Sequence, residues 1–429
     1  MPTREENELL TRIGPGTPMG DVLRRYWIPA AMSSELPGPD CAPIRVKLLG
    51  ENLVVFRDTQ GRVGLLDGFC AHRRASLFLG RNEECGIRCV YHGWKYDVEG
   101  NCVDMPSEPP ESNFKDKIHL KAYPTVEMGD IIWAYLGPKE LMPPPPKFEW
   151  TQVPQNCRVV AKVWEECNWL QAVEGNVDTV HASFLHRKLT PESKRAGISP
   201  DSVWLKSSTA PRLDVKLTDY GFFYAGIRPM GQQGSFIIVN HYVLPFHQMR
   251  ATTSGGHITS ALIEGHMVVP MDDENCMDYV WRVTLAGHDR AELERIERER
   301  GRSSADIGQD FRKVRNKDND WQIDREVQRT ETFSGIDGIN NQDQACQESM
   351  GAICDRTQEH LGSTDKAIVA VRHLLMQAVK SVQESKDPLG TGTSYYSIRP
   401  AVKIVASNVY WLDEMKNELR SESKAEAQP

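Results

Sequence analysis

The chain has 429 residues, of which 40% are hydrophobic and 26% charged, and this composition is typical of a globular protein of more than one small domain. Its 59 acidic and 51 basic residues give a formal charge of −8, which argues against nucleic acid as the main partner. No apolar run is long enough for a membrane span, and the charged N-terminus does not resemble a targeting peptide. We therefore expect a cytoplasmic protein whose ten cysteines are free thiols or metal ligands.

A short helix is predicted near the N-terminus. Thr3 is followed three residues later by Glu6, the pattern of a capping box, and apolar residues follow at helical spacing. The Gly14-Pro15-Gly16 run ends this helix. We expect residues 1–26 to form an N-terminal helical segment.

Short strands are predicted between residues 44 and 136, because apolar and β-branched runs alternate with Gly, Asp and Asn turns. This pattern is typical of a compact antiparallel β-domain, which we expect to occupy residues 27–146. The tetraproline Pro143–Pro146 can continue neither a helix nor a central strand. It is therefore expected to separate two domains.

The second domain, expected over residues 147–415, has an α+β pattern with one antiparallel sheet and an amphipathic helix over residues 367–382. Its predicted strands are 159–164, 222–227, 236–244, 257–264 and 279–285. Residues 289–329 are dense in charge, and we interpret them as a solvated excursion in preference to a partner-docking surface. Residues 416–429 are expected to be a polar tail.

Two cysteines and two histidines stand out in the β-domain. Cys70 and His72 form one pair, and Cys89 and His92 form a second pair after sixteen intervening residues. Zinc sites usually pair Cys with Cys and His with His in separate knuckles. A Rieske [2Fe-2S] cluster instead binds one iron through two Cys and the other through two His. One Cys and one His in each loop therefore favour the two-iron cluster over a zinc site or ordinary buried thiols.

A second constellation begins the second domain. Asp178 and His181 are three residues apart and share a helix face, whereas His186 lies about 140° further round at 3.6 residues per turn. The helix must therefore bend or end if both imidazoles are to converge. Two converging histidines and one carboxylate make the facial triad of non-haem iron(II) oxygenases. The common alternative is a buried histidine bonded to a neighbour.

Together these motifs resemble the catalytic subunit of Rieske non-haem iron oxygenases, and most closely the phthalate dioxygenase-like branch of ring-hydroxylating dioxygenases and aryl-ether O-demethylases. Residues 14–20, Glu174-Gly175 and residues 341–351 are also similar to that branch. The resemblance implies an α+β fold. Its N-terminal antiparallel β-sandwich Rieske domain would precede a helix-grip catalytic domain with a central antiparallel sheet.

The resemblance also assigns roles to individual residues. It makes His181 and His186 ligands of a mononuclear Fe(II), with Asp343 as the third ligand and Glu348 or Asp355 as competitors for that place. Asp178 is similar to the aspartate that bridges electrons from the cluster of a neighbouring subunit in a head-to-tail homotrimer. Whether a separate β subunit exists stays open.

The implied function is that of a terminal oxygenase component that uses O₂ and NADH. The chain has no G-x-G-x-x-G dinucleotide motif, so a separate flavin and iron-sulfur reductase is expected to supply the electrons. The substrate would be an aromatic carboxylate or a lignin-derived methoxylated aromatic, with ring hydroxylation and O-demethylation both open. A stand-alone electron carrier and a structural zinc protein are the alternatives, and neither nucleic acid nor a membrane is expected as a partner.

The substrate pocket is expected on the strands of the second domain. Its predicted apolar wall is Phe223, Ile238, Val243 and Met267, with His241 and His247 among them. Arginine recognises a carboxylate through two parallel N–H donors, and the candidates for that contact are Arg228, Arg250 and Arg282, each with a surface ion pair as the alternative.

Overall fold

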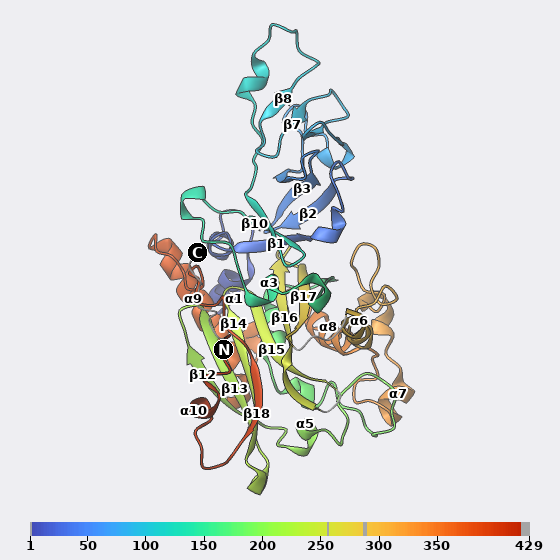
Figure 1. Ribbon diagram of the computed structural model, residues 1–429, viewed down its shortest axis with the longest axis vertical. Helices are drawn as coiled ribbons and strands as arrows, with labels where there is room; N and C mark the ends of the chain where they lie inside the picture. Colours follow the sequence, from blue (N-terminus) through green and yellow to red (C-terminus); the bar gives the residue numbers. More distant parts are fainter. Residues whose placement is uncertain (1, 255–256, 286–289, 422–429) are drawn as a thin grey trace.

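The computed structural model describes residues 2–254, 257–285 and 290–421. It has two parts, which we call the first and second domains (Figure 1). The first domain projects from the second, with β7 and β8 at its far end and β1 and β10 at the junction. No helix within the described ranges has the length and apolar character that a membrane span requires.

The N-terminal segment forms two helices rather than one. The predicted capping box of α1 (Arg4–Thr11) is present, because Thr3 and Glu6 exchange backbone-to-side-chain hydrogen bonds. A second helix, α2 (Pro18–Leu23), begins after Thr17, whose hydroxyl accepts from the Gly20 amide. Both helices pack against α9 (Lys366–Gln383) of the second domain.

The first domain consists of antiparallel strands in three small sheets, in agreement with the predicted pattern of short runs. One sheet has β1 (Trp27–Met32), β10 (Ile131–Tyr135) and β9 (Thr125–Met128). Another has β2 (Ile44–Leu48), β3 (Glu51–Arg57) and β4 (Val63–Asp67). The third has β5 (Arg81–Glu83), β6 (Gly86–Arg88), β7 (Lys95–Tyr96) and β8 (Cys102–Asp104).

Aromatic side chains join the two domains. After the tetraproline, α3 (Glu149–Gln152) carries Trp150, which stacks on Trp281 with ring centroids 4.5 Å apart. The rings of Trp133 of β10 and Trp150 have centroids 6.4 Å apart. All three rings are buried and give the junction an apolar centre, while ion pairs such as Lys47–Asp272 and Arg158–Asp130 also join the domains.

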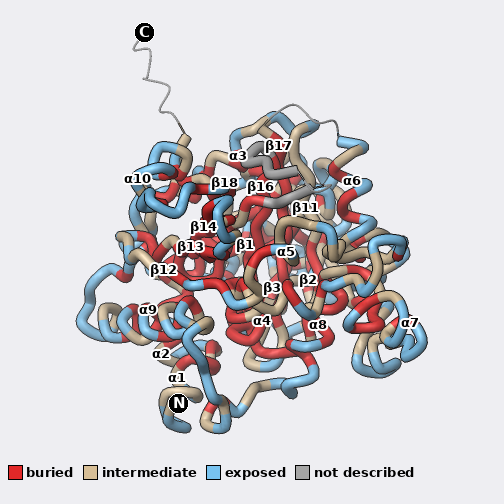
Figure 2. Tube along the Cα trace, turned by 90° about the horizontal axis from the view of Figure 1, so that it is seen from below, coloured by how far each residue is buried: buried red, intermediate tan, exposed pale blue. Residues whose placement is uncertain are grey.

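The second domain is built on one antiparallel sheet of eight strands, which confirms the predicted α+β class with a central antiparallel sheet. The strand order is β11 (Arg158–Glu165), β17 (Cys276–Thr284), β16 (His257–Pro270), β15 (His247–Ser254), β14 (Ser235–Val243), β13 (Gly221–Pro229) and β12 (Arg212–Leu217), with β18 (Ala401–Val405) also paired to β14. Buried residues gather along these strands, whereas α7 (Arg325–Thr330) lies among exposed ones (Figure 2).

Helices cover this sheet and carry several of the candidate site residues. The helix α4 (Trp169–Val177) contacts β15, β16 and β17, and both α8 (Ile339–Ser349) and α9 contact α4. The second domain also contains the short helices α5 (Val203–Lys206) and α10 (Trp411–Met415), and α6 (Arg290–Glu299).

The interpretation of residues 289–329 as a solvated excursion is wrong for its central part. Leu293 and Ile296 of α6 pack on Leu262, and Glu297, Arg302 and Lys313 are buried. Charges can be buried when they are paired, and Glu297 forms ion pairs with both Arg282 and Arg302. A run of charged residues therefore contributes to the interior here.

The first part of the predicted tail is also ordered. Leu419 is buried against β14 and β18, and its carbonyl accepts from the Arg399 amide. The Ser421 amide donates to Ser397. The remaining residues of the predicted tail, 422–429, lie outside the described residues.

Candidate metal centres

Two loops of the first domain have the same backbone structure. The Cys70 amide donates to the Ala75 carbonyl and the Cys89 amide to the Trp94 carbonyl, each five residues on. In both loops the residue four positions after the cysteine, Arg74 or Gly93, has positive φ and donates its amide to that cysteine's carbonyl. Cys70 and Cys89 therefore occupy equivalent positions, and His72 and His92 follow them by two and three residues.

These loops place sulfur inside and imidazole outside. Cys70 and Cys89 are buried, whereas His72 is exposed and His92 is half-buried. The two imidazole rings lie 4.4 Å apart between centroids, and His72 stacks on Trp94. Burial, with a further contribution from Cys89, raises the pKa of the Cys70 thiol. Two thiols and two imidazoles in these paired loops are the donor set that a Rieske cluster requires.

The second constellation forms where α4 ends. The helix stops at Val177, Asp178 has extended φ and ψ, and His181 begins a short 3-10 turn, Asp178 being the C-cap. This break lets the His181 and His186 imidazoles converge, with ring centroids 5.1 Å apart. Asp343 reaches the same point from α8.

Three donor atoms face one another at this point. Asp343 Oδ1 lies 3.0 Å from His186 Nε2 and 3.4 Å from His181 Nε2, yet it is buried without a hydrogen bond among the described residues. Three ligand atoms within 4.8 Å of one another fit a single metal ion. Two of the three groups, His181 and His186, also line the adjoining cavity.

The outer nitrogens of both imidazoles are held by hydrogen bonds. His181 Nδ1 lies 3.0 Å from Asp178 Oδ2, and His186 Nδ1 lies 2.7 Å from Gln342 Oε1. An oxygen acceptor at Nδ1 keeps the proton there and directs the Nε2 lone pair inward. This orientation suits both rings to binding a cation.

The electrostatics of the three groups also suit a cation. Burial alone would lower the pKa of His181, but its hydrogen bond with Asp178 and the negative charges of Asp343 and Asp178 raise it to about 10. Burial would raise the pKa of Asp343, but electrostatic attraction from the neighbouring His186 and His181 holds it well below its usual range. A field that retains a proton so strongly also attracts a divalent metal ion.

The two competing carboxylates are engaged elsewhere. Glu348 accepts from the Glu166 amide at 3.1 Å and from Trp321 Nε1 at 2.7 Å. Asp355 is exposed and caps the turn at Thr357. Neither carboxylate is among the three groups that converge.

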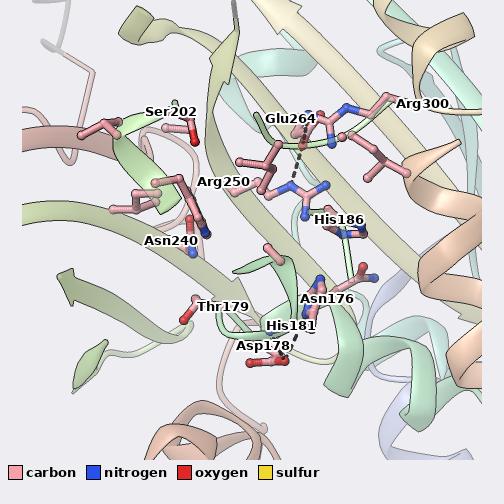
Figure 3. A pocket seen from close by; sticks show the side chains of 18 of the residues that line it. Asn176, Asp178, Thr179, His181, His186, Ser202, Asn240, Arg250, Glu264 and Arg300 are labelled. Carbon is pink, nitrogen blue, oxygen red and sulfur yellow. Dashed lines mark hydrogen bonds and ion pairs between the residues drawn. The ribbon is translucent and has the colours of Figure 1, made fainter. Parts of the chain in front are cut away.

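A cavity of about 500 Å³ opens beside the two histidines. The loop 197–204 and strands β14, β15 and β16 form its other walls. Figure 3 shows the Arg250 guanidinium extending from Glu264 toward His186, with Arg300 beyond Glu264. A cavity of this size can enclose a substituted aromatic ring.

The sheet register decides which strand residues reach this cavity. Tyr224 pairs with Asn240, Tyr242 with Gln248, and Arg250 with Glu264, so even-numbered side chains share one face across β13 to β16. The cavity is lined from that face by Ile238, Asn240, Gln248, Arg250 and Glu264. Odd-numbered residues of the regular part of these strands point to the opposite face, and the odd-numbered Ala251 reaches the cavity beside a register shift in β15.

Most of the predicted pocket residues lie elsewhere for this reason. His241 bonds to the Tyr220 hydroxyl and the Arg399 carbonyl, both at 2.9 Å, and His247 accepts from Trp281 Nε1 at 2.9 Å. The expectation that these two histidines line the pocket is corrected. Phe223, Val243 and Met267 are odd-numbered and are likewise not among the lining residues.

Two of the three predicted arginines are even-numbered but lie behind the cavity wall. Arg228 stacks at 4.1 Å on Trp204 and donates to the Thr179 carbonyl, while Arg282 pairs with Glu264 and Glu297. Arg250 alone of the three lines the cavity in the described residues.

Sequence reasoning missed several residues of this site. Asn240 and Gln248 are polar residues in phase with Arg250, so strand periodicity could have found them. Gln342 and Arg300 gave no local signal. Gln342 lies on α8 and bonds to His186, which is remote in the chain. Arg300 follows the charged α6 and reaches the cavity from there.

Comparison with known proteins covers both domains. The Rieske [2Fe-2S] domain family matches residues 26–124, and the LigXa C-terminal domain-like family matches residues 134–425. The phthalate 4,5-dioxygenase oxygenase subunit of Pseudomonas putida is 38% identical, over 96% of this chain and 94% of its own length. The 3-chlorobenzoate-3,4-dioxygenase oxygenase subunit of Comamonas testosteroni is 36% identical, over 96% of this chain and 97% of its own.

A third relative and a solved structure extend the comparison. The 5,5'-dehydrodivanillate O-demethylase oxygenase subunit of Sphingobium sp. is 32% identical, over 90% of this chain and 83% of its own. The structure of the Pseudomonas putida CBB5 NdmA QL mutant with caffeine covers 91% of this chain and 99% of its own, with a TM-score of 0.61 at 20% identity. This structural likeness confirms the predicted two-part fold.

Proposed function

The chain belongs to the Rieske non-haem iron oxygenases, as an oxygenase subunit with a [2Fe-2S] domain and an iron-containing catalytic domain, and from this premise we propose its site residues, substrate class and partners. Cys70, His72, Cys89 and His92 would hold the cluster, and His181, His186 and Asp343 would hold the mononuclear Fe(II). The single observation that carries the second assignment is Asp343 Oδ1, which faces both Nε2 atoms without a hydrogen bond.

The bound iron centres supply reductive activation of O₂ and insertion of oxygen into the substrate. The protein's own groups prepare that chemistry. Asp178 and Gln342 keep the Nδ1 protons of the two histidines in place. The cavity encloses the substrate beside these histidines, and its walls restrict bulk water.

Asp178 is proposed to connect the two centres between subunits. Its carboxylate is 19% exposed while it bonds to His181, so it can also accept a hydrogen bond from outside the chain. The exposed His72 and half-buried His92 offer ring nitrogens to a partner, and His92 lies shortly before β7 (Lys95–Tyr96) in the chain. A head-to-tail homotrimer would bring one subunit's His72 or His92 to its neighbour's Asp178.

The substrate is proposed to be an aromatic carboxylate. Arg250 and Arg300 line the cavity within a buried network in which four arginines (250, 282, 300 and 302) share two glutamates (264 and 297). Burial lowers the pKa of Arg300 to about 10, so both cavity arginines are charged at neutral pH. This excess of positive charge is best neutralised by an anion in the cavity.

The named relatives support this class, because phthalate and 3-chlorobenzoate are aromatic carboxylates. The O-demethylase relative supports methoxylated aromatic acids as well, so ring hydroxylation and removal of a methyl group are both included in the proposal. Electrons are proposed to come from NADH through a separate reductase. The stand-alone electron carrier and the zinc protein are disfavoured by the histidine and aspartate set in the second domain.

The proposal is tested by O₂ uptake and product analysis with NADH and a matching reductase. The panel contains phthalate, 3-chlorobenzoate, phenoxybenzoate and 5,5'-dehydrodivanillate, each beside its methyl ester. We expect uptake with at least one acid, and Arg250→Gln and Arg300→Gln should each raise its KM about tenfold or more. Arg81→Gln, at an exposed pair with Glu83, is the control.

If O₂ uptake is the same with an acid and with its methyl ester, the proposed class of aromatic carboxylate substrates is contradicted. A protein that contains the cluster but no mononuclear iron would instead indicate an electron carrier. A colourless protein that contains only zinc would contradict both iron assignments.

A further inference from the structure

A buried chain of three side chains leads away from the cavity. Arg250 Nη2 lies 3.3 Å from His266 Nε2, and His266 Nδ1 lies 2.7 Å from Asp278 Oδ2. His266 is 1% exposed and Asp278 2% exposed, whereas 22% of the Arg250 side chain remains accessible. Only the arginine end of this chain reaches the cavity.

Hydrogen-bond chemistry fixes the role of each group. A guanidinium can only donate, so His266 Nε2 must accept from Arg250. The imidazole proton is then on Nδ1, where it is donated to the Asp278 carboxylate. Asp278 therefore holds His266 in the tautomer that can bind the arginine.

Arg250 has a second anchor at its Nε. Its Nε donates to Glu264 Oε1 at 2.5 Å. Glu264 also pairs with Arg282 and faces Arg300 at 3.7 Å, so it is shared among three arginines. The contacts with Glu264 and His266 use Nε and Nη2, and both leave Nη1 unused.

Without His266 the guanidinium could turn about its long side chain, and both Nε and Nη2 could bind Glu264. Arginine makes its strongest contacts with a carboxylate when its planar group is already oriented. An acceptor fixed at Nη2 prevents this rotation. Strand register supports the arrangement, because Gln248 pairs with His266 and Arg250 with Glu264 on the same face.

We propose that His266 and Asp278 are positioning residues that hold the Arg250 guanidinium toward the cavity and so set the enzyme's preference for a carboxylate-bearing substrate. This inference rests on the proposed role of Arg250 in substrate binding. Neither residue contacts the cavity in the described residues, so both act through Arg250.

The test uses the iron-loaded enzyme and isothermal titration calorimetry. Phthalate, 3-chlorobenzoate and phenoxybenzoate are each titrated beside the methyl ester, and the tightest acid is the probe. The readout is the affinity for the acid divided by that for its ester. His266→Phe, which keeps a ring but has no acceptor, should lower this ratio about tenfold. His266→Gln, which keeps an acceptor, should restore it to within about threefold of wild type.

His247→Phe is the matched control. His247 is buried on the opposite face of the same sheet, so its replacement should leave the ratio unchanged. Thermal unfolding confirms that each variant is folded, and His266→Leu takes the place of His266→Phe if the larger ring prevents folding. In an Arg250→Gln background, His266→Phe should change the ratio less than about twofold.

The outcomes separate the two proposals. If no acid binds, or if Arg250→Gln leaves the ratio intact, the proposed carboxylate site is wrong. If Arg250→Gln lowers the ratio but His266→Phe does not, only the positioning role is overturned. An equal effect of His266→Phe in both backgrounds would also overturn it, because His266 would then act independently of Arg250.

Discussion

The two candidate metal centres differ in how their ligands are assembled. In the first domain, four residues come from two short loops with matching hydrogen bonds, and the histidines face solvent. In the second domain, His181 and His186 follow α4, whereas Asp343 comes from the distant α8, and a cavity adjoins them. An outward-facing centre is accessible to a redox partner, whereas an enclosed one limits contact of reactive oxygen with water.

The difference also concerns how each centre depends on the rest of the chain. The loop centre requires only local turns, of the kind that Gly93 makes at φ +78°. The enclosed centre requires a helix end, a second helix and the sheet face to be correctly packed. The two centres should therefore be separable by mutation.

The largest effect is expected for Asp343→Ala. Because this carboxylate faces both Nε2 atoms, its loss should remove at least about 90% of the mononuclear iron and abolish turnover, while the cluster spectrum is unchanged. Metal analysis and EPR spectroscopy measure both. Asp355→Asn, at an exposed carboxylate, should retain the iron. Full iron content in Asp343→Ala would move the assignment to another carboxylate.

The converse is expected for Cys89→Ser. Loss of one buried thiolate should remove the visible absorption of the cluster and stop turnover, with the mononuclear iron retained. The control is Cys85→Ser in the same region, a cysteine outside the two loop pairs. An unchanged visible spectrum in Cys89→Ser would exclude this cysteine as a ligand.

Asp178→Asn tests the connection between the centres. Both metals should remain bound in iron-saturated protein, but turnover should fall at least about 100-fold, because a neutral amide no longer bridges the histidines in the required protonation state. Single-turnover reduction of each centre would locate the defect. Wild-type turnover in Asp178→Asn would contradict the proposed role of Asp178 as a bridge.

A smaller effect is expected for Gln342→Leu. Losing the acceptor at His186 Nδ1 should weaken iron binding about tenfold without changing the cluster. Iron titration of the apoprotein measures this change. The neighbouring Gln344→Leu is the control, because the Gln344 amide bonds to Glu165 instead. Equal losses in both variants would indicate general damage to α8.

Much of the candidate site could be predicted from the sequence because it is encoded locally. The spacing of Cys70, His72, Cys89 and His92 already shows the mixed pairs, and the positions of Asp178, His181 and His186 already required the helix to end. These patterns span few residues, so chain geometry alone brings their side chains near one another.

The tertiary structure decided the rest. The sequence did not predict β15, so the pairing of β14 with β15 was unknown. It was therefore not possible to predict that odd-numbered His241 and His247 lie on the face opposite to Arg250. Arg300 and Gln342 reach the cavity and His186 from segments that are remote in the chain. The face of the sheet on which a strand residue lies depends on the strand register, and contacts between remote segments depend on the packing of the whole domain. The sequence by itself therefore determined the metal-binding loops and the oxygenase family, whereas only packing determined which charges face the substrate.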